Sequence, residues 1–229
     1  ILWKIPVFLA DFGVFFLLFR YFNKKSFILA VLIGGIWLLN PYFMARYEYT
    51  LFDPVQIFFL LLAVTLLGKR DGLAGIFFGL AVSIKLIPLI IFPIIIYFAK
   101  SKIRLLIWLF ITLLAVSLPF MLSRDDFEYY IKGAFLVHEV REIQGRPLLS
   151  FATYNLNRYG VNLFQNEYYS MYALLALVSG PILSLYLIYK KGYKKIYALC
   201  LVSFCCYYLF APILNRTHLL WFLPFMLVG

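Results

Sequence analysis

Positive charge gathers at the ends of apolar runs, and this arrangement restricts the possible folds more than any other feature of the chain. Twelve of the 21 Lys and Arg residues form four clusters, and only Asp71 of the ten acidic residues lies among them. Basic residues that flank spans mark the cytoplasmic side of a membrane. The clusters therefore predict several spans whose basic ends lie inside. They are Arg20/Lys24/Lys25, Lys69/Arg70, Lys100/Lys102/Arg104 and Lys190/Lys191/Lys194/Lys195.

Composition agrees with a membrane protein. Hydrophobic residues make up 65% of the chain and charged residues 14%, which excludes a soluble domain with an ordinary core. The net charge of +11 would suggest nucleic acid as a partner of a soluble protein, but topology and anionic lipid explain it here. We therefore expect no nucleic-acid partner. We expect a multi-pass protein of the cell membrane in a prokaryote, or of the endoplasmic reticulum in a eukaryote.

The predicted fold is all-α, a polytopic helical domain that takes up residues 1–229 as a single unit. Spans of roughly 17 to 25 apolar residues suit a hydrocarbon core of about 30 Å. The chain begins at Ile1 and stops within an apolar run, so we interpret it as a piece of a longer protein. The predicted full or truncated crossings are Ile5–Arg20, Ser26–Leu39, Val55–Gly68, Ile103–Leu122, Tyr169–Tyr189 and Ile196–Ile213.

The segment Gly72–Ala99 has basic residues beyond both ends, so it must cross an even number of times. Its two arms would each be roughly 20 Å long, at about 1.5 Å per residue. We predict a shallow hairpin with Lys85 at or near its apex. Pro88 and Pro93 fit the start and a kink of the second arm. One long helix would avoid the short arms but would place the Lys100 cluster outside.

Residues 123–168 form the predicted outer loop, which opens with an interfacial amphipathic helix over Asp125–Glu142. Phe127 and Ile131 lie on its apolar face, and one more turn brings His138 and Arg141 to that face. Arg146 follows where Gly and Pro end the helix. These side chains either contact a substrate or are solvated charges of a surface helix.

Further candidates lie in or beside the spans. Asp11 and Lys85 sit at membrane depth, where ionisable groups are costly and often functional. The alternatives are a structural partner between helices for Asp11 and snorkelling to head groups for Lys85. Asp53 can act chemically or as an ordinary helix N-cap. His218, in a tight outer turn, can bind substrate or simply lie at the interface.

Three cysteines share one apolar run, which suits neither a disulfide framework nor a metal site. The three cysteines are Cys200, Cys205 and Cys206. We expect no metal and no cofactor.

Short motifs follow one another in a defined order and spacing along nearly the whole chain. These motifs are Lys4-Ile5-Pro6 and Ala10-Asp11, Leu39-Asn40-Pro41, Phe52-Asp53, Gly79-Leu80-Ala81-Val82 before Lys85 and Pro88, the stretch from His138 through Arg141 to Ser150, and Asn215 to Pro224 with His218 and Trp221. In their order and spacing the chain resembles the polyprenyl-phosphate-sugar-dependent glycosyltransferases of the GT-C fold, and in particular mannosyltransferases.

Two departures from the family pattern stand out. Related chains often carry Gly-Gln-x-Asp in the second outer loop, where this chain has Thr50-Leu51-Phe52-Asp53, so only the Asp carries over. The usual catalytic Asp of the family lies in the first outer loop. That loop and the span before it would precede Ile1.

The resemblance implies an inverting transfer from a dolichyl or undecaprenyl phosphate sugar to a glycan, glycolipid or protein acceptor at the non-cytoplasmic face. Within this sequence it implies a catalytic carboxylate at Asp53. The membrane lipid is the further partner. The alternative is a lipid or solute transporter or flippase, which would use Asp11 and Lys85 as midplane charges. The implied substrate-binding residues are Asp11, Lys85, His138, Arg141, Arg146 and His218.

Overall fold

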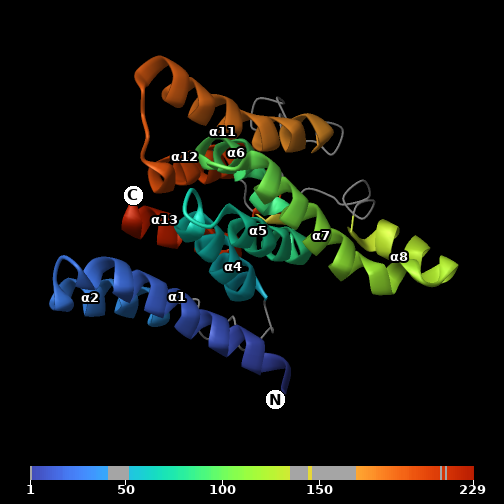
Figure 1. The fold of residues 1–229 in the computed structure, drawn as a ribbon, viewed down its shortest axis with the longest axis horizontal. Helices are drawn as coiled ribbons and strands as arrows, with labels where there is room; N and C mark the ends of the chain where they lie inside the picture. Colours follow the sequence, from blue (N-terminus) through green and yellow to red (C-terminus); the bar gives the residue numbers. More distant parts are fainter. Residues whose placement is uncertain (1, 41–51, 135–143, 146–168, 212, 215) are drawn as a thin grey trace, which may run out of the picture.

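The computed structural model describes residues 2–40, 52–134, 144–145, 169–211, 213–214 and 216–229, which are helical except for one short strand pair (Figure 1). The predicted all-α membrane fold is confirmed. Within the described residues, three helices are long and apolar enough to cross a bilayer: α1, α7 and α11. The helices are η1 (Leu2–Lys4), α1 (Ile5–Asn23), α2 (Phe27–Leu38), α4 (Asp53–Leu66), α5 (Asp71–Ile84), η2 (Ile87–Ile91), α6 (Phe92–Phe98), α7 (Lys102–Met121), α8 (Arg124–Ala134), α11 (Tyr169–Lys191), α12 (Ile196–Phe210), η5 (Arg216–Leu220) and α13 (Leu223–Val228).

The helix ends follow local sequence signals. The Ser26 side chain accepts a hydrogen bond from the Leu29 amide and so caps α2. After α4 and α11 the chain turns at Gly68 and Gly192, which have φ values of 73° and 65°. Only glycine adopts this left-handed conformation without strain. Both turns fall within basic clusters, so the clusters coincide with helix connections, as the sequence predicts.

The predicted hairpin around Lys85 is present. Helix α5 ends at Ile84, and Lys85 has an extended backbone before the chain returns through η2 and α6. At the other end, the Asp71 carboxylate accepts hydrogen bonds from the amides of Gly68, at 2.7 Å, and Ser101, at 2.6 Å. One buried side chain therefore ties the turn before α5 to the turn before α7. Two of the basic clusters consequently lie at the same end of the helices.

The second arm of the hairpin is broken, as its prolines predict. Pro88 lies in the first turn of η2, and Pro93 lies in the first turn of α6. Proline fits the first turn of a helix because the missing N–H has no partner there. The arm therefore contains two short helices in place of one.

Small residues let pairs of helices approach closely. A Cβ atom on Gly75 of α5 would come within 2.3 Å of the Leu105 carbonyl oxygen of α7, and one on Gly79 would lie 2.9 Å from Thr112 Cβ. Gly75 and Gly79 form the GxxxG spacing that is typical of close contacts between membrane helices. Helices α11 and α12 also approach closely at a glycine, because a Cβ atom on Gly180 would lie 2.6 Å from Ser203 Cα.

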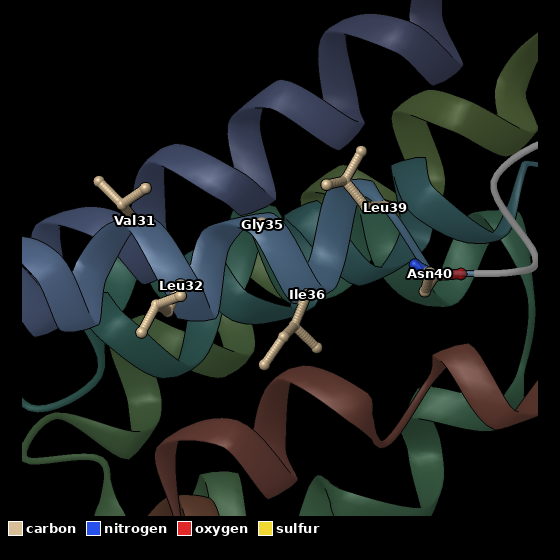
Figure 2. Close-up of a pocket in the computed structure, with 6 residues that line it drawn as sticks. All are labelled: Val31, Leu32, Gly35, Ile36, Leu39 and Asn40. Carbon is tan, nitrogen blue, oxygen red and sulfur yellow. The ribbon is translucent and has the colours of Figure 1, made fainter.

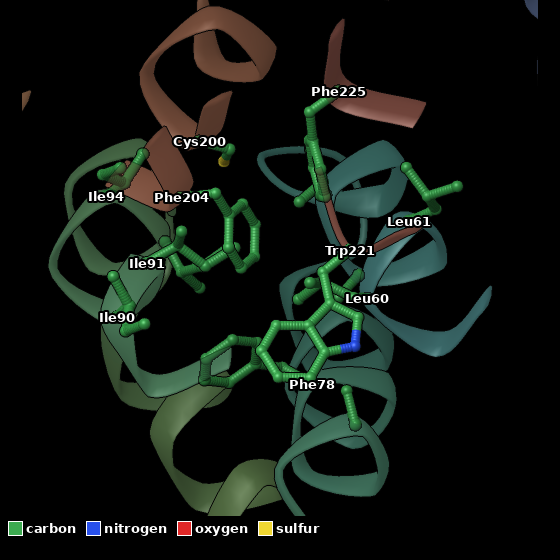
Figure 3. Close-up of a cluster of buried hydrophobic side chains, with 14 of the residues drawn as sticks. Leu60, Leu61, Phe78, Ile90, Ile91, Ile94, Cys200, Phe204, Trp221 and Phe225 are labelled. Atoms are coloured by element: carbon green, nitrogen blue, oxygen red, sulfur yellow. The ribbon is translucent and has the colours of Figure 1, made fainter. Parts of the chain in front are cut away.

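The core lies between α4, α5, η2, α6, α12 and the C-terminal helices (Figure 3). Trp221, Phe204 and Phe225 are buried there with aliphatic side chains from the other elements. By contrast, α1, α2, α7 and α11 expose many large apolar side chains. Apolar surfaces of this kind are suited to contact with the hydrocarbon chains of a bilayer. Figure 1 shows α1 and α2 side by side on one edge of the body, with α11 on the opposite edge.

Helix α8 is the described part of the predicted amphipathic helix; residues 135–143 lie outside the description. Its Tyr130 ring stacks on Phe120 of α7 with centroids 5.1 Å apart, and its hydroxyl lies 2.9 Å from Ser117 Oγ. Glu128 and Lys132, four residues apart on this helix, form an ion pair at 2.6 Å. The hydrogen bond from Lys132 and its charge lower the pKa of Glu128. Phe127 is exposed, so the apolar face of α8 is available to a membrane surface.

Two very short strands link the outer loop to the C-terminal region. Strand β1 (Gln144–Gly145) pairs in parallel with β2 (Ile213–Leu214). The strand β2 immediately precedes η5, which carries His218. Residues 144–145 therefore lie beside the strand that comes shortly before η5 and His218.

Candidate active site

Asp53 lies at the first position of α4 and is fully buried, with 0% of its surface exposed. The N-cap residue is Phe52, and no side chain caps this helix end. The N-cap alternative for Asp53 is therefore wrong. Pro54 follows in the first turn, where it costs no hydrogen bond. The carboxylate is consequently free to turn away from its own helix and into the domain.

One oxygen of this carboxylate holds together three parts of the chain. Asp53 Oδ1 accepts hydrogen bonds from Lys85 Nζ and from Trp221 Nε1, each at 2.6 Å. Lys85 reaches it because α5 ends at Ile84 and the chain becomes extended. Trp221 reaches it from the end of η5. Hydrogen bonds to an ionised group are short and about twice as strong as neutral ones, so the carboxylate has a defined orientation.

Lys85 is the accessible member of this group. Its side chain is 35% exposed, whereas that of Asp53 is 1% exposed. The ammonium also lies 5.1 Å from the centre of the Trp221 ring, within the range of a cation–π contact. An ammonium has three hydrogens to donate, and Asp53 accepts one. Lys85 therefore does not merely snorkel: it holds a buried carboxylate and still presents donors to a ligand.

His218 and Tyr208 complete an aromatic wall around Trp221. The His218 ring stacks on Trp221 with centroids 4.3 Å apart and an interplanar angle of 23°. The Tyr208 hydroxyl donates a hydrogen bond to the His218 carbonyl oxygen. Tyr208 is itself buried on α12. These rings connect α12 and η5 to the Asp53–Lys85 pair, so His218 lies one ring away from that pair; its role in substrate binding stays a prediction.

The second oxygen of Asp53 is buried and has no hydrogen-bond partner among the described residues. The same is true of Oε1 of Gln56, one helical turn along α4. The sequence motifs do not identify Gln56, Tyr208 or the contact between Trp221 and Asp53 as parts of this candidate site. A signal for Gln56 does exist in the sequence: an amide three residues after an Asp lies on the same helix face.

The remaining predicted site residues are not brought together by the described contacts. His138, Arg141 and Arg146 lie outside the described residues. Asp11 is buried on α1, on the face that carries Val7, Ala10 and Val14. Helix α1 packs on α4, where Phe58 fills the space over Gly13. A role of Asp11 in substrate binding stays a prediction.

The part of the chain that the structure describes contains no group of three or more His, Cys, Asp or Glu side chains able to hold a metal ion. The absence of a metal stays a prediction for the whole chain. The chemistry of the Asp53 site itself is that of an oriented carboxylate beside an accessible cation. Such a pair can accept a proton on one side and stabilise negative charge on the other.

An apolar groove with a volume of about 600 Å³ runs along α2, away from these charges (Figure 2). Leu32 and Ile36 point to one side of the helix in this view, and Val31 and Leu39 point to the other. The lining is aliphatic except at one end, where Asn40 donates a hydrogen bond to the Trp37 carbonyl oxygen. The groove can accommodate a hydrocarbon chain and offers no catalytic group.

Comparison with known proteins identifies the family. The model of glycosyltransferase family 87 matches residues 1–214, which is most of the chain. The chain therefore belongs to glycosyltransferase family 87, and the protein is a membrane glycosyltransferase. This confirms the predicted enzyme class and does not support the transporter alternative. Among curated proteins and among solved structures, no match was found.

Proposed function

We propose that this family 87 glycosyltransferase moves a sugar from a polyprenyl phosphate to a hydroxyl of a glycan, glycolipid or protein acceptor. The reaction takes place at the non-cytoplasmic face, on a GT-C-type membrane domain, and inverts the anomeric carbon. The observation that carries the proposal is the buried Asp53 carboxylate, with one oxygen held by Lys85 and Trp221 and the other without a partner. This site lies at the end of α5 opposite to the basic cluster at Lys69 and Arg70.

Asp53 acts as the general base in this proposal. Lys85 and Trp221 fix Oδ1, so Oδ2 is left to accept the proton of the attacking hydroxyl. The acceptor oxygen forms a bond to the anomeric carbon while the bond from that carbon to the phosphate oxygen breaks. The bonding electrons leave with the polyprenyl phosphate. A positioned base contributes typically 10²- to 10⁴-fold to such a step.

Lys85 stabilises the leaving group. The phosphate gains negative charge as the sugar departs, and an ammonium beside it lowers the energy of that state. The 35% exposure of the Lys85 side chain leaves room for a phosphate oxygen next to Asp53. His218, one ring away across Trp221, supplies a further donor. The outer-loop residues His138, Arg141 and Arg146 are proposed to complete the phosphate site, and Asp11 to support it from α1.

The lipid part of the donor would remain in the membrane. The exposed faces of α1, α2, α7 and α11 are apolar, and the groove on α2 offers a place along which an isoprenoid tail can lie (Figure 2). A lipid-linked sugar thus approaches from the side, whereas a water-soluble nucleotide sugar would need a polar entrance.

The test is a transfer assay in proteoliposomes that contain polyprenyl-phosphate sugars and a membrane glycan extract as acceptor. Asp53→Asn should lower turnover by roughly 100-fold or more, because the base is lost. Lys85→Met keeps the aliphatic stem and should lower turnover by about ten-fold or more, the effect of losing one charged contact. Transfer from nucleotide sugars, with none from polyprenyl-phosphate sugars, would refute the proposed donor.

The double variant D53N/K85M separates catalysis from structure. If the ion pair only holds the fold, removing both charges should restore folding and activity together. If the pair is catalytic, the double variant folds but remains inactive. The matched control is the exposed pair of Glu128 and Lys132 on α8, where E128Q/K132M should leave turnover unchanged.

A further inference from the structure

Two buried oxygen atoms on one face of α4 accept no hydrogen bond from any part of the chain that the structure describes. They are Asp53 Oδ2 and Gln56 Oε1, in residues that are 0% and 2% exposed. Residues three apart on a helix are neighbours, with Cβ atoms about 5–6 Å apart. Buried polar groups are nearly always paired in folded proteins. Two adjacent exceptions, beside the accessible ammonium of Lys85, therefore mark a place where a ligand supplies the missing partner.

The missing partner must bring hydrogen-bond donors, because both unpaired atoms are acceptors. A metal cation would be repelled by Lys85, whose Nζ lies 2.6 Å from the other oxygen of Asp53. The described residues also offer no third His, Cys, Asp or Glu side chain that could complete a coordination sphere here. Neutral hydroxyl groups are not repelled by Lys85 and need no third ligand. Two acceptors side by side suit two hydroxyls of one sugar ring.

We propose that Asp53 Oδ2 and Gln56 Oε1 together bind two hydroxyl groups of a sugar, and that Gln56 determines which sugar is used. This inference rests on the proposed function and adds a residue to the same site. Asp53 receives the hydroxyl that reacts or lies nearest to the reacting carbon, and Gln56 receives a second hydroxyl that stays intact. A site that hydrogen-bonds a hydroxyl rejects the analogue without it, because its own buried group is then left unpaired.

The first measurement uses the wild-type protein and a series of deoxy sugars. Removing the hydroxyl that Gln56 binds should reduce kcat/KM by about ten-fold or more. Gln56→Leu should cause a similar loss with the intact sugar and little further loss with that deoxy sugar. This lack of additivity is the specific signature of a direct contact.

Ser179→Ala is the matched control. Ser179 Oγ on α11 is also buried without a hydrogen-bond partner, so both substitutions remove an orphaned polar atom. If such atoms are only structural defects, both variants should be as stable as the wild type or more stable, with unchanged kinetics. Kinetics of Gln56→Leu equal to wild type on every sugar would overturn the inference.

Two binding assays distinguish the transferred sugar from the acceptor sugar. If Gln56 contacts the acceptor, as the base role of Asp53 requires, donor binding should stay unchanged while KM for the acceptor rises. If Gln56→Leu instead weakens binding of polyprenyl-phosphate sugar and leaves binding of bare polyprenyl phosphate unchanged, Asp53 Oδ2 faces the transferred sugar. That second result supports the sugar contact but refutes the proposed base role of Asp53. A wild-type enzyme that ignores polyprenyl-phosphate sugars but shows the Gln56 signature with another donor would refute only the proposed donor.

Discussion

At the scale of single residues, Trp221 is the link on which the site depends. Its ring lies in the hydrophobic core, while its indole N–H reaches the Asp53 carboxylate. The same ring faces Lys85 on one side and stacks with His218. Trp221 therefore sets the position of a negative group, a positive group and an imidazole at once.

Trp221→Phe removes the N–H donor and keeps an aromatic ring for Lys85 and His218. A hydrogen bond to a charged group contributes about 1.5–3 kcal/mol, so kcat should fall by roughly ten- to a hundred-fold. KM for the donor should change little, because the phosphate contact is retained. Steady-state kinetics in proteoliposomes measure both values.

Trp108→Phe on α7 is the control, because Trp108 is exposed and does not contact Asp53 within the described residues. A kcat for Trp221→Phe as high as that of this control would show that the indole hydrogen bond does not contribute to catalysis.

The site could be predicted only in part at this scale. Ionisable residues in apolar runs single out Asp11 and Lys85, and the family resemblance adds Asp53 and His218. The contacts of Asp53 could not be predicted, because Asp53 is 32 residues from Lys85 and 168 from Trp221 along the chain. Gln56 is uncharged, and its importance becomes visible only when burial and hydrogen bonds are known.

At the scale of helices, the contact between α5 and α7 depends on the absence of side chains. Gly75→Ala should destabilise the protein by about 1–3 kcal/mol, because its Cβ would collide with a backbone oxygen that cannot move away. Gly35→Ala on α2 is the counterpart, because nothing lies within 4 Å of its new Cβ. That change should be neutral or stabilise by about 0.5–1 kcal/mol.

Unfolding by denaturant in detergent micelles compares the two alanine variants. Equal stability of both would contradict the close packing of α5 on α7.

The helix positions can be predicted from the sequence, because apolar runs and prolines determine where a helix begins and ends without help from distant residues. The bounds of α5 and α7 fall within one residue of the predicted segments Gly72–Ile84 and Ile103–Leu122. The hydrogen bonds of Asp71 could not be predicted, since both donors are backbone amides in separate turns. The basic residues beside Asp71 suggest an ion pair, but its carboxylate accepts hydrogen bonds from the backbone instead.

At the scale of the whole molecule, the basic clusters predict the orientation in the membrane. Single cysteines at Lys69 and Lys100, in a protein without its three native cysteines, should react with a polar label only from the cytoplasmic side. A cysteine at Ser123 should react from the outside. Labelling of position 100 from the outside would contradict both the orientation and the hairpin that places Lys85 at its apex.

The length of the two helices that carry the site has a consequence for the depth of the site in the membrane. Helices α4 and α5 each contain 14 residues. At about 1.5 Å per residue each spans about 21 Å, roughly 9 Å less than a typical hydrocarbon core. Both helices are packed in the core, so the longer helices α1, α7 and α11 face the lipid in their place. We therefore expect the Lys85 end of α5 to lie below the level of the head groups, so that a lipid phosphate must move inward to meet it.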